Sequence, residues 1–229
     1  MRRLLHLKHR KLLAGPYLFW AVSFVIIPLL MIVYYGLTDK SGAFTLENII
    51  AVTTREHSKA LWLSLLLSLI ATVICLLLSY PLAMILCSRK GCQHSVIVFI
   101  FILPMWMNFL LRTLAWQTLL EKNGVINSIL AFFHLPQQSI INTPGAIVLG
   151  MVYSFLPFMV LPIYNVLAKI DKDVIYAARD LGANEFQTFT QIIFPLSIPG
   201  IISGITMVFV PALTTFVISD LLGGSKILL

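Results

Sequence analysis

Three side chains that can bind a solute lie together in one apolar stretch of the chain. Asn108, Arg112 and Trp116 follow one another at intervals of four, so they share one face of a helix. A charge within a membrane span is costly, and the guanidinium of Arg112 should therefore face a bundle interior or an aqueous pathway. The group is expected either to brace neighbouring helices through hydrogen bonds or to contact a substrate directly.

Catalytic and metal-binding patterns do not occur in the sequence. Cys75, Cys87 and Cys92 have no CxxC spacing, and the five histidines are scattered over termini and loops, which argues against a metal site. The motifs GxSxG, HExxH, GxxxxGK[ST] and GxGxxG are also missing. The chain is therefore expected to be no enzyme and to hold no cofactor of its own. Any nucleotide chemistry must belong to a partner.

The elements that position these residues are membrane spans. The chain is 59% hydrophobic and 11% charged, with a mean hydropathy of +0.95, a composition that excludes a soluble globular domain. It predicts an all-α integral membrane protein. Five apolar spans are expected, at residues 14–37, 61–87, about 95–120, 143–167 and about 200–222.

Positive residues set the expected orientation. Residues 1–13 carry five of them, and the apolar run that follows is too long for a signal peptide, so an uncleaved first helix is expected. With the N-terminus in the cytoplasm, the inside segments hold ten Lys and Arg residues and the outside segments five. The net charge of +7 thus indicates membrane orientation rather than nucleic acid binding.

A polar island at residues 171–199 separates the last two spans. Asp171 suits a helix N-terminus, Gly182 suits the left-handed turn that ends a helix, and Asn184 with Gln187 resembles a capping box. Two short helices around a glycine are therefore expected. Their apolar faces predict either a hairpin folded back on its own membrane domain or a docking surface for another protein.

The island resembles a known motif. AARDLG, followed by Phe194, Pro195 and the SIPG segment, is similar to the EAA loop of membrane-spanning subunits of binding-protein-dependent ABC importers. In that family the loop is cytoplasmic and its helix sits in a groove of the ATPase subunit. The sequence departs from the family at Tyr176, which replaces the usual Glu, and at Phe194, which replaces Leu. The resemblance implies ATPase-coupling roles for Ala177, Ala178, Asp180, Gly182, Ile192 and Pro195.

A second resemblance concerns the substrate. LPMWMNFLLRTLAW, LPFMVLPIY and SDLLGG look like the first permease of spermidine/putrescine importers. Polyamines are flexible multivalent cations, best received by carboxylates and aromatic faces. Glu121 and Asp220 are the expected carboxylates, with Trp106 and Trp116 as aromatic walls. Each of these four residues has an alternative role at a helix end or a membrane interface.

These resemblances imply the permease of a type I ABC importer, a single membrane domain at residues 14–229 with a cytoplasmic coupling loop at 169–199. The implied partners are ATPase subunits that bind ATP and Mg, a second similar permease, an extracytoplasmic binding protein and membrane lipid. The bacterial cytoplasmic membrane is the implied location. Family members have a sixth span, which this chain is expected to lack. Alternatives are another cargo (ferric ion, thiamine, molybdate or an amino acid) or an ATP-independent carrier.

Overall fold

The computed structural model describes residues 15–39, 42–52, 54–88, 103 and 105–224, and these are mostly helical. Contacts divide the chain into two compact units, Met1–Lys59 and Ala60–Leu229. The basic segment 1–13 lies outside the described residues, as does most of the first half of the predicted third span.

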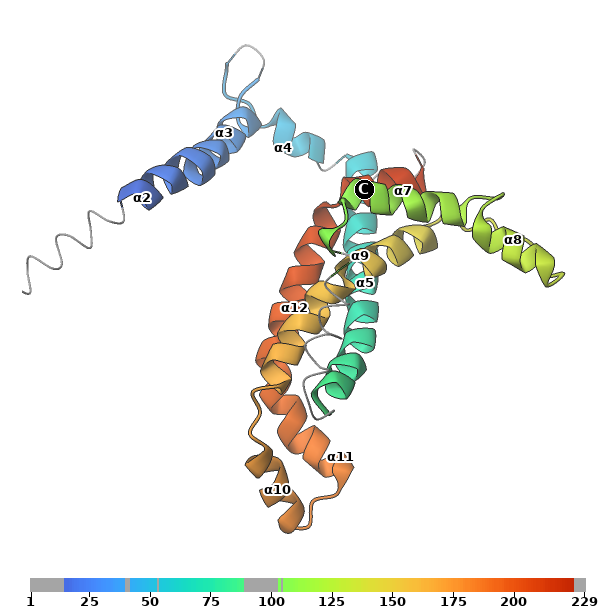
Figure 1. Ribbon diagram of the computed structural model, residues 1–229. Coiled ribbons are helices and arrows are strands. Elements are labelled where there is room, and N and C mark those ends of the chain that lie inside the picture. The colour runs from blue at the N-terminus through green and yellow to red at the C-terminus, as the bar shows by residue number, and fades with distance from the viewer. Residues whose placement is uncertain (1–14, 40–41, 53, 89–102, 104, 225–229) are drawn as a thin grey trace, which may run out of the picture. The chain divides into compact units, whose positions relative to one another are not determined.

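One apolar helix dominates the first unit (Figure 1). It consists of α2 (Gly15–Ala21), the π-helical turn η1 (Val22–Ile26) and α3 (Ile27–Gly36), which together form a span-length helix of 22 residues. Within this unit none of these residues is buried, and the surface of the helix is apolar. The predicted first span is confirmed as a helix of that length. A short α4 (Glu47–Val52) follows it.

Three long helices form the body of the second unit: α5 (Arg55–Ser88), α9 (Pro144–Leu167) and α12 (Phe194–Thr214). At 1.5 Å per residue, a helix of 24 residues such as α9 covers about 36 Å, more than the roughly 30 Å of a bilayer's hydrocarbon core. The thiols of Cys75 and Cys87 on α5 lie 3.8 Å from the carbonyl oxygens of Val152 and Tyr164 on α9. These contacts pack α5 against α9. The bounds of the two helices lie close to those predicted for the second and fourth spans.

Two glycines allow α9 and α12 to pack closely. A Cβ at Gly200 would lie 2.9 Å from the carbonyl oxygen of Pro162, and one at Gly204 would lie 2.6 Å from the sulfur of Met159. A larger residue at either position would push the helices apart. The GxxxG spacing of Gly200 and Gly204 therefore serves close helix packing.

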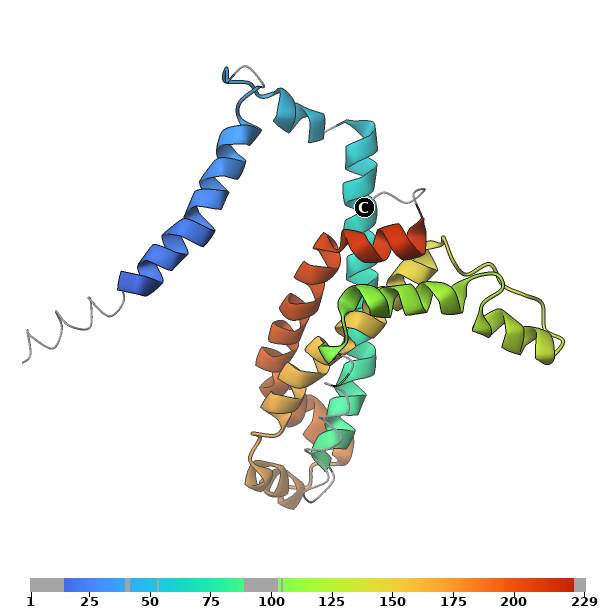
Figure 2. The same cartoon turned by 45° about the horizontal axis from the view of Figure 1, so that its top comes forward.

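The predicted third span does not continue as one helix to Leu120. The backbone turns at Asn108 (φ −55°, ψ 127°), and a separate helix α7 (Phe109–Leu120) begins there because the Asn108 side chain accepts hydrogen bonds from the amides of Leu110 and Leu111. Its 12 residues cover about 18 Å, too short to cross a bilayer. Figures 1 and 2 show α7 crosswise to α5 and α12.

The predicted fifth span is also divided. Its helix begins much earlier, at Glu185, and ends at Thr214. Thr215 (ψ 97°) breaks the chain direction, and α13 (Phe216–Gly223) packs against α9 and α7 instead of prolonging α12. Among the described residues, four helices are long and apolar enough to cross a membrane. The expected count of five spans, with the family's sixth span missing, is not confirmed.

Candidate functional site

Residues 171–193 form a hairpin beyond the end of α9, below the three long helices in Figure 1. The carboxylate of Asp171 accepts the amide of Asp173 at 3.0 Å and starts α10 (Lys172–Asp180). Gly182 has a φ of 87° and turns the chain, and Asn184 and Gln187 form a reciprocal capping box that starts α11 (Glu185–Thr188). The predicted pair of helices around a glycine is confirmed, including both caps.

The hairpin keeps its backbone satisfied and leaves apolar side chains outside. Leu181 is 90% exposed and Phe186 is 74% exposed, while Ala177 and Asp180 are also on the surface. Ala178 is different: it is 8% exposed, and its carbonyl accepts the amide of Ala183 across the turn. Ala178 is therefore buried while Ala177 is exposed, and the coupling roles that the resemblance implies for both stay a prediction.

Ile192 and Pro195 lie where the hairpin joins the long helix. A π-helical turn η2 (Phe189–Ile193) connects α11 to α12 without a break, so Glu185–Thr214 is one rod of 30 residues. Ile192 is half-buried in this turn, and Pro195 is exposed at the start of α12. Any displacement of α11 is therefore carried directly into a membrane-length helix.

Tyr80 on α5 anchors this junction, a contact that the sequence reasoning missed. Its hydroxyl is 2.9 Å from that of Ser197, and its ring lies 5.9 Å from the ring of Phe189 and 6.1 Å from that of Phe194. A tyrosine within an apolar run is a signal that could have revealed it, because a buried phenol needs a polar partner. Phe194, which departs from the family pattern, has a packing role here.

Arg112 is buried at the other end of α9, but on α7 and not within a long span. Its guanidinium carbon lies 5.6 Å from the ring centre of Phe109 and 5.9 Å from that of Tyr153, and the Trp116 ring packs edge-on against Tyr153 at 5.1 Å. Since Tyr153 belongs to α9, this cluster joins α7 to α9. Arg112 thus lies between helices, where cation–π contacts suit a brace.

The remaining candidates for a substrate pathway are spread over this end. Trp106 is 72% exposed, and Asn108 serves as the cap of α7 rather than sharing a helical face with Arg112. Glu121 is exposed at the end of α7, and Asp220 is exposed on α13, which packs against α7. Arg112 and Trp116 both contact Tyr153. Among the described contacts, none links Glu121 or Asp220 to this cluster.

Asn127 organises the loop between α7 and α9 and was also missed. It lies on α8 (Val125–Phe132) and is 2% exposed. Its amide nitrogen lies within hydrogen-bond distance of the carbonyls of Glu121, Lys122 and Gln138, and its oxygen accepts the amide of Gln138 at 2.9 Å. The Asn127 side chain therefore connects the start of this loop, at Glu121 and Lys122, with its later part at Gln138.

Residues 79–228, more than half of the chain, match the family described as "Binding-protein-dependent transport system inner membrane component". The chain belongs to this family. It is a multi-pass membrane permease of the inner-membrane type, and the EAA-like island and the capped hairpin both lie within the matched region.

Curated relatives of the permease cover nearly its whole length. It is 36% identical to the spermidine/putrescine transport system permease protein PotB of Haemophilus influenzae, over 99% of this chain and 82% of the relative. The protein of the same name from Escherichia coli K12 is 39% identical, over 92% and 79%. A homolog of it in Mycoplasma genitalium is 29% identical, over 97% and 77%.

Solved structures share the fold of the permease at low sequence identity. A bacterial ABC transporter that imports the acidic polysaccharide alginate aligns with a TM-score of 0.80 at 17% identity, over 99% of this chain and 82% of that one. The alginate transporter in complex with a periplasmic protein gives 0.72 at 17% identity, over 88% and 72%. The fold is therefore that of an ABC importer permease.

Proposed function

We propose that this permease forms half of a polyamine pathway in a type I ABC importer. The observation that carries the proposal is the near full-length similarity, at 36% and 39% identity, to two relatives named as spermidine/putrescine permeases. The chain itself performs no covalent chemistry in this scheme. ATP and Mg are bound by ATPase subunits, a second similar permease completes the pathway, and an extracytoplasmic binding protein delivers the substrate.

The 171–193 hairpin is the proposed contact with the ATPase. Its backbone ends are capped from within, and the exposed Leu181 and Phe186 offer the kind of apolar anchors that a partner groove can bury. Ala177, Asp180 and Gly182 lie beside them on the exposed turn, while Ala178 supports the turn from inside. The positive residues that flank the spans favour a cytoplasmic position for this hairpin and for the N-terminus.

The continuous helix Glu185–Thr214 is the proposed route for force. A movement of α11 driven by ATPase closure would rotate or shift α12, and the close contact at Gly200 and Gly204 would pass the motion to α9. At its far end, α9 packs against α7 and α13, where the candidate pathway residues lie. A rigid lever of this kind can link nucleotide hydrolysis to opening on the other side of the membrane.

Substrate contact is proposed for the end that carries α7 and α13. Exposed Glu121 and Asp220 would attract a polycation, and Trp106 and Trp116 would offer aromatic faces to its ammonium groups. Arg112 repels such a substrate and is buried against Tyr153, so we assign it to bracing. Asn108 is assigned to capping α7 in the same way.

Reconstitution tests the proposal. The permease, its paired permease and the ATPase would be placed in liposomes with the binding protein outside, and uptake of spermidine and putrescine would be compared with uptake of thiamine and ferric ion. ATP-dependent uptake of the polyamines alone is expected. Uptake that persists without the ATPase would identify a secondary carrier and overturn the proposal.

A matched pair of aromatic substitutions tests the docking surface. Phe186→Asp should abolish capture of the ATPase by the purified permease, because it places a charge on the exposed anchor. Phe132→Asp changes an equally exposed phenylalanine on α8 and should leave capture unchanged. Equal capture by both variants would remove the hairpin from the interface.

A further inference from the structure

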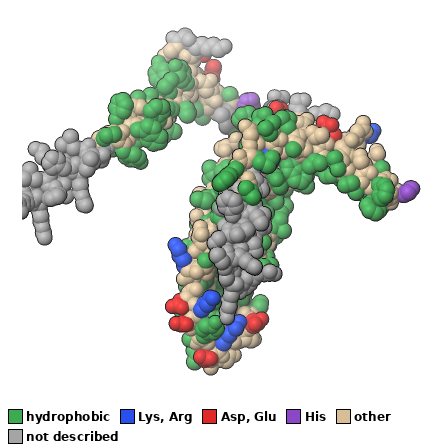
Figure 3. All heavy atoms as spheres, viewed as in Figure 1, with side chains coloured by type: hydrophobic (Ala, Val, Ile, Leu, Met, Phe, Trp, Pro, Cys, Tyr) green, Lys and Arg blue, Asp and Glu red, His purple; other side chains and the backbone are tan. Residues whose placement is uncertain are grey.

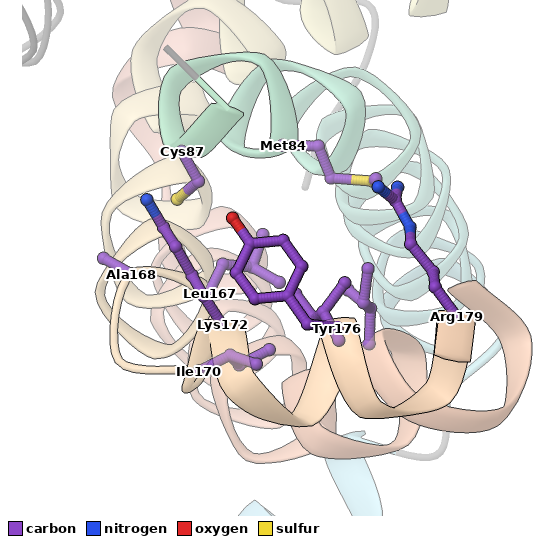
Figure 4. A pocket seen from close by; sticks show the side chains of 10 residues that line it. Met84, Cys87, Leu167, Ala168, Ile170, Lys172, Tyr176 and Arg179 are labelled. Carbon is purple, nitrogen blue, oxygen red and sulfur yellow. The ribbon is translucent and has the colours of Figure 1, made fainter. Parts of the chain in front are cut away.

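A cavity of about 350 Å³ lies between α10 and the ends of two long helices, and the proposed import cycle makes no use of it. Met84 of α5, Leu167 of α9 and Ile193 of η2 form its apolar wall. Figure 4 shows Lys172, Tyr176 and Arg179 pointing from α10 toward the end of α5, where Met84 and Cys87 lie. The cavity is thus closed on one side by spans and on the other by the hairpin.

The α10 side of the cavity is positively charged. Lys172, Tyr176 and Arg179 recur at intervals of four and three, so they occupy one helical face. Among the described residues that line the cavity there is no carboxylate. Arg179 lies 3.6 Å from Glu185, but both side chains are well exposed, and such surface pairs are weak and exchange readily. Both cations therefore remain available to an anion at the mouth.

The mouth lies at the ends of two apolar helices of span length, a depth at which such helices are expected to leave a membrane. α5 ends at Ser88 and α9 ends at Leu167, and both ends border the cavity. Lipid headgroups occupy this depth, and Lys and Arg side chains at helix ends reach toward them. Basic pockets between membrane helices are suited to anionic headgroups.

We propose that this cavity binds one anionic phospholipid. Its phosphate would pair with Lys172 and Arg179, and part of an acyl chain would cover Met84, Leu167 and Ile193. A soluble phosphate would leave that apolar wall in water, a neutral lipid would leave the two cations uncompensated, and a polyamine would be repelled. The lipid would hold α10 against the end of α5 and so link the hairpin to the composition of the membrane.

Native mass spectrometry of the purified transporter complex tests this, with dioleoyl phosphatidylglycerol and dioleoyl phosphatidylcholine as the two probes. Neither ATP nor substrate is needed, so the result does not depend on the proposed function. We expect K172Q or R179Q to weaken phosphatidylglycerol binding about fivefold each, and the double variant about twenty-five-fold. K169Q removes a cation that does not line the cavity and should leave binding unchanged.

Two further variants and a local probe make the test specific. E185Q removes the ion pair but keeps Arg179, so lipid binding should be retained. Cys87 lines the cavity, and phosphatidylglycerol should slow its alkylation by N-ethylmaleimide in a C92S background. Equal binding of both lipids, loss of binding in K169Q or E185Q, or equal protection of Cys87 by glycerol 3-phosphate would each overturn the proposal.

Discussion

The 171–193 hairpin and the segment from α7 to α8 lie at opposite ends of α9, and both are built from short helices. In the hairpin, side chains such as Asp171 and Asn184 satisfy the backbone locally, which leaves Leu181 and Phe186 exposed. At the α7 end, Asn127 and Arg112 are instead buried in contacts between segments of the same chain. The hairpin thus leaves apolar side chains exposed, where we propose that a partner docks, whereas the α7 end buries its polar side chains in contacts within the chain.

The largest expected effect concerns Asn127. Its replacement by Leu leaves buried carbonyls and an amide without their partner, at a cost of about 3 kcal/mol in the free energy of unfolding. Thermal unfolding of the permease in detergent should show a clear fall in Tm. Ser128→Ala removes a single hydrogen bond, from the Ser128 hydroxyl to the carbonyl of Gly124 one helical turn earlier, and should have little effect on Tm. Equal melting of both variants would contradict the bracing role.

The next largest effect is expected for substitution of Gly182, in the hairpin at the opposite end of α9. Its φ of 87° disfavours β-branched residues, although a Cβ there would meet no atom within 4 Å, so Gly182→Val costs about 1–2 kcal/mol through the backbone alone. ATPase capture and ATP-driven uptake should fall about fivefold to thirtyfold. Gly182→Asn tolerates the left-handed turn and should retain both. Unchanged capture by the Val variant would show that the turn does not position the interface.

Arg112→Lys sharpens the comparison from the bracing side. The change keeps the charge but loses the planar group over the Tyr153 ring, so a loss of about 1 kcal/mol in stability is expected. Arg179→Lys at the exposed hairpin should leave Tm unchanged. If Arg112→Lys instead alters the half-saturating polyamine concentration while Tm holds, Arg112 contacts substrate and the bracing assignment is wrong.

The smallest effect is expected for the exposed carboxylates of the α7 end. Asp220→Asn and Glu121→Gln should each raise the half-saturating polyamine concentration about twofold to fivefold, because exposed charges attract a polycation only through screened fields. Glu185→Gln at the hairpin end is the matched control and should change nothing in this measurement. Wild-type uptake in both test variants would remove these two residues from the pathway.

Local patterns in the sequence predicted the hairpin well. The caps at Asp171 and Asn184 and the turn at Gly182 depend on residues near in sequence, and all three were found. The first, second and fourth spans were predicted because long apolar runs need no tertiary information.

The errors arose where hydropathy is uniform but the backbone turns. Asn108 begins α7 and Thr215 separates α12 from α13, and each lies inside a run that remains largely apolar on both sides. Arg112 was therefore placed within a span, when it lies on a crosswise helix. The contacts of Tyr80 with Ser197 and of Arg112 with Tyr153 join residues far apart in the chain, and the sequence does not say which residue is the partner of either.

The π-helical turn at Phe189–Ile193 fixes the direction in which the hairpin faces. Such a turn is equivalent to one residue inserted into an α-helix, and each residue of an α-helix accounts for about 100° of rotation. Deletion of one residue here would leave α12 in its place in the bilayer and swing the hairpin by roughly a quarter turn or more about the helix axis. The hairpin would then no longer face the ATPase subunit that we propose it contacts, although every one of its exposed side chains would still be present.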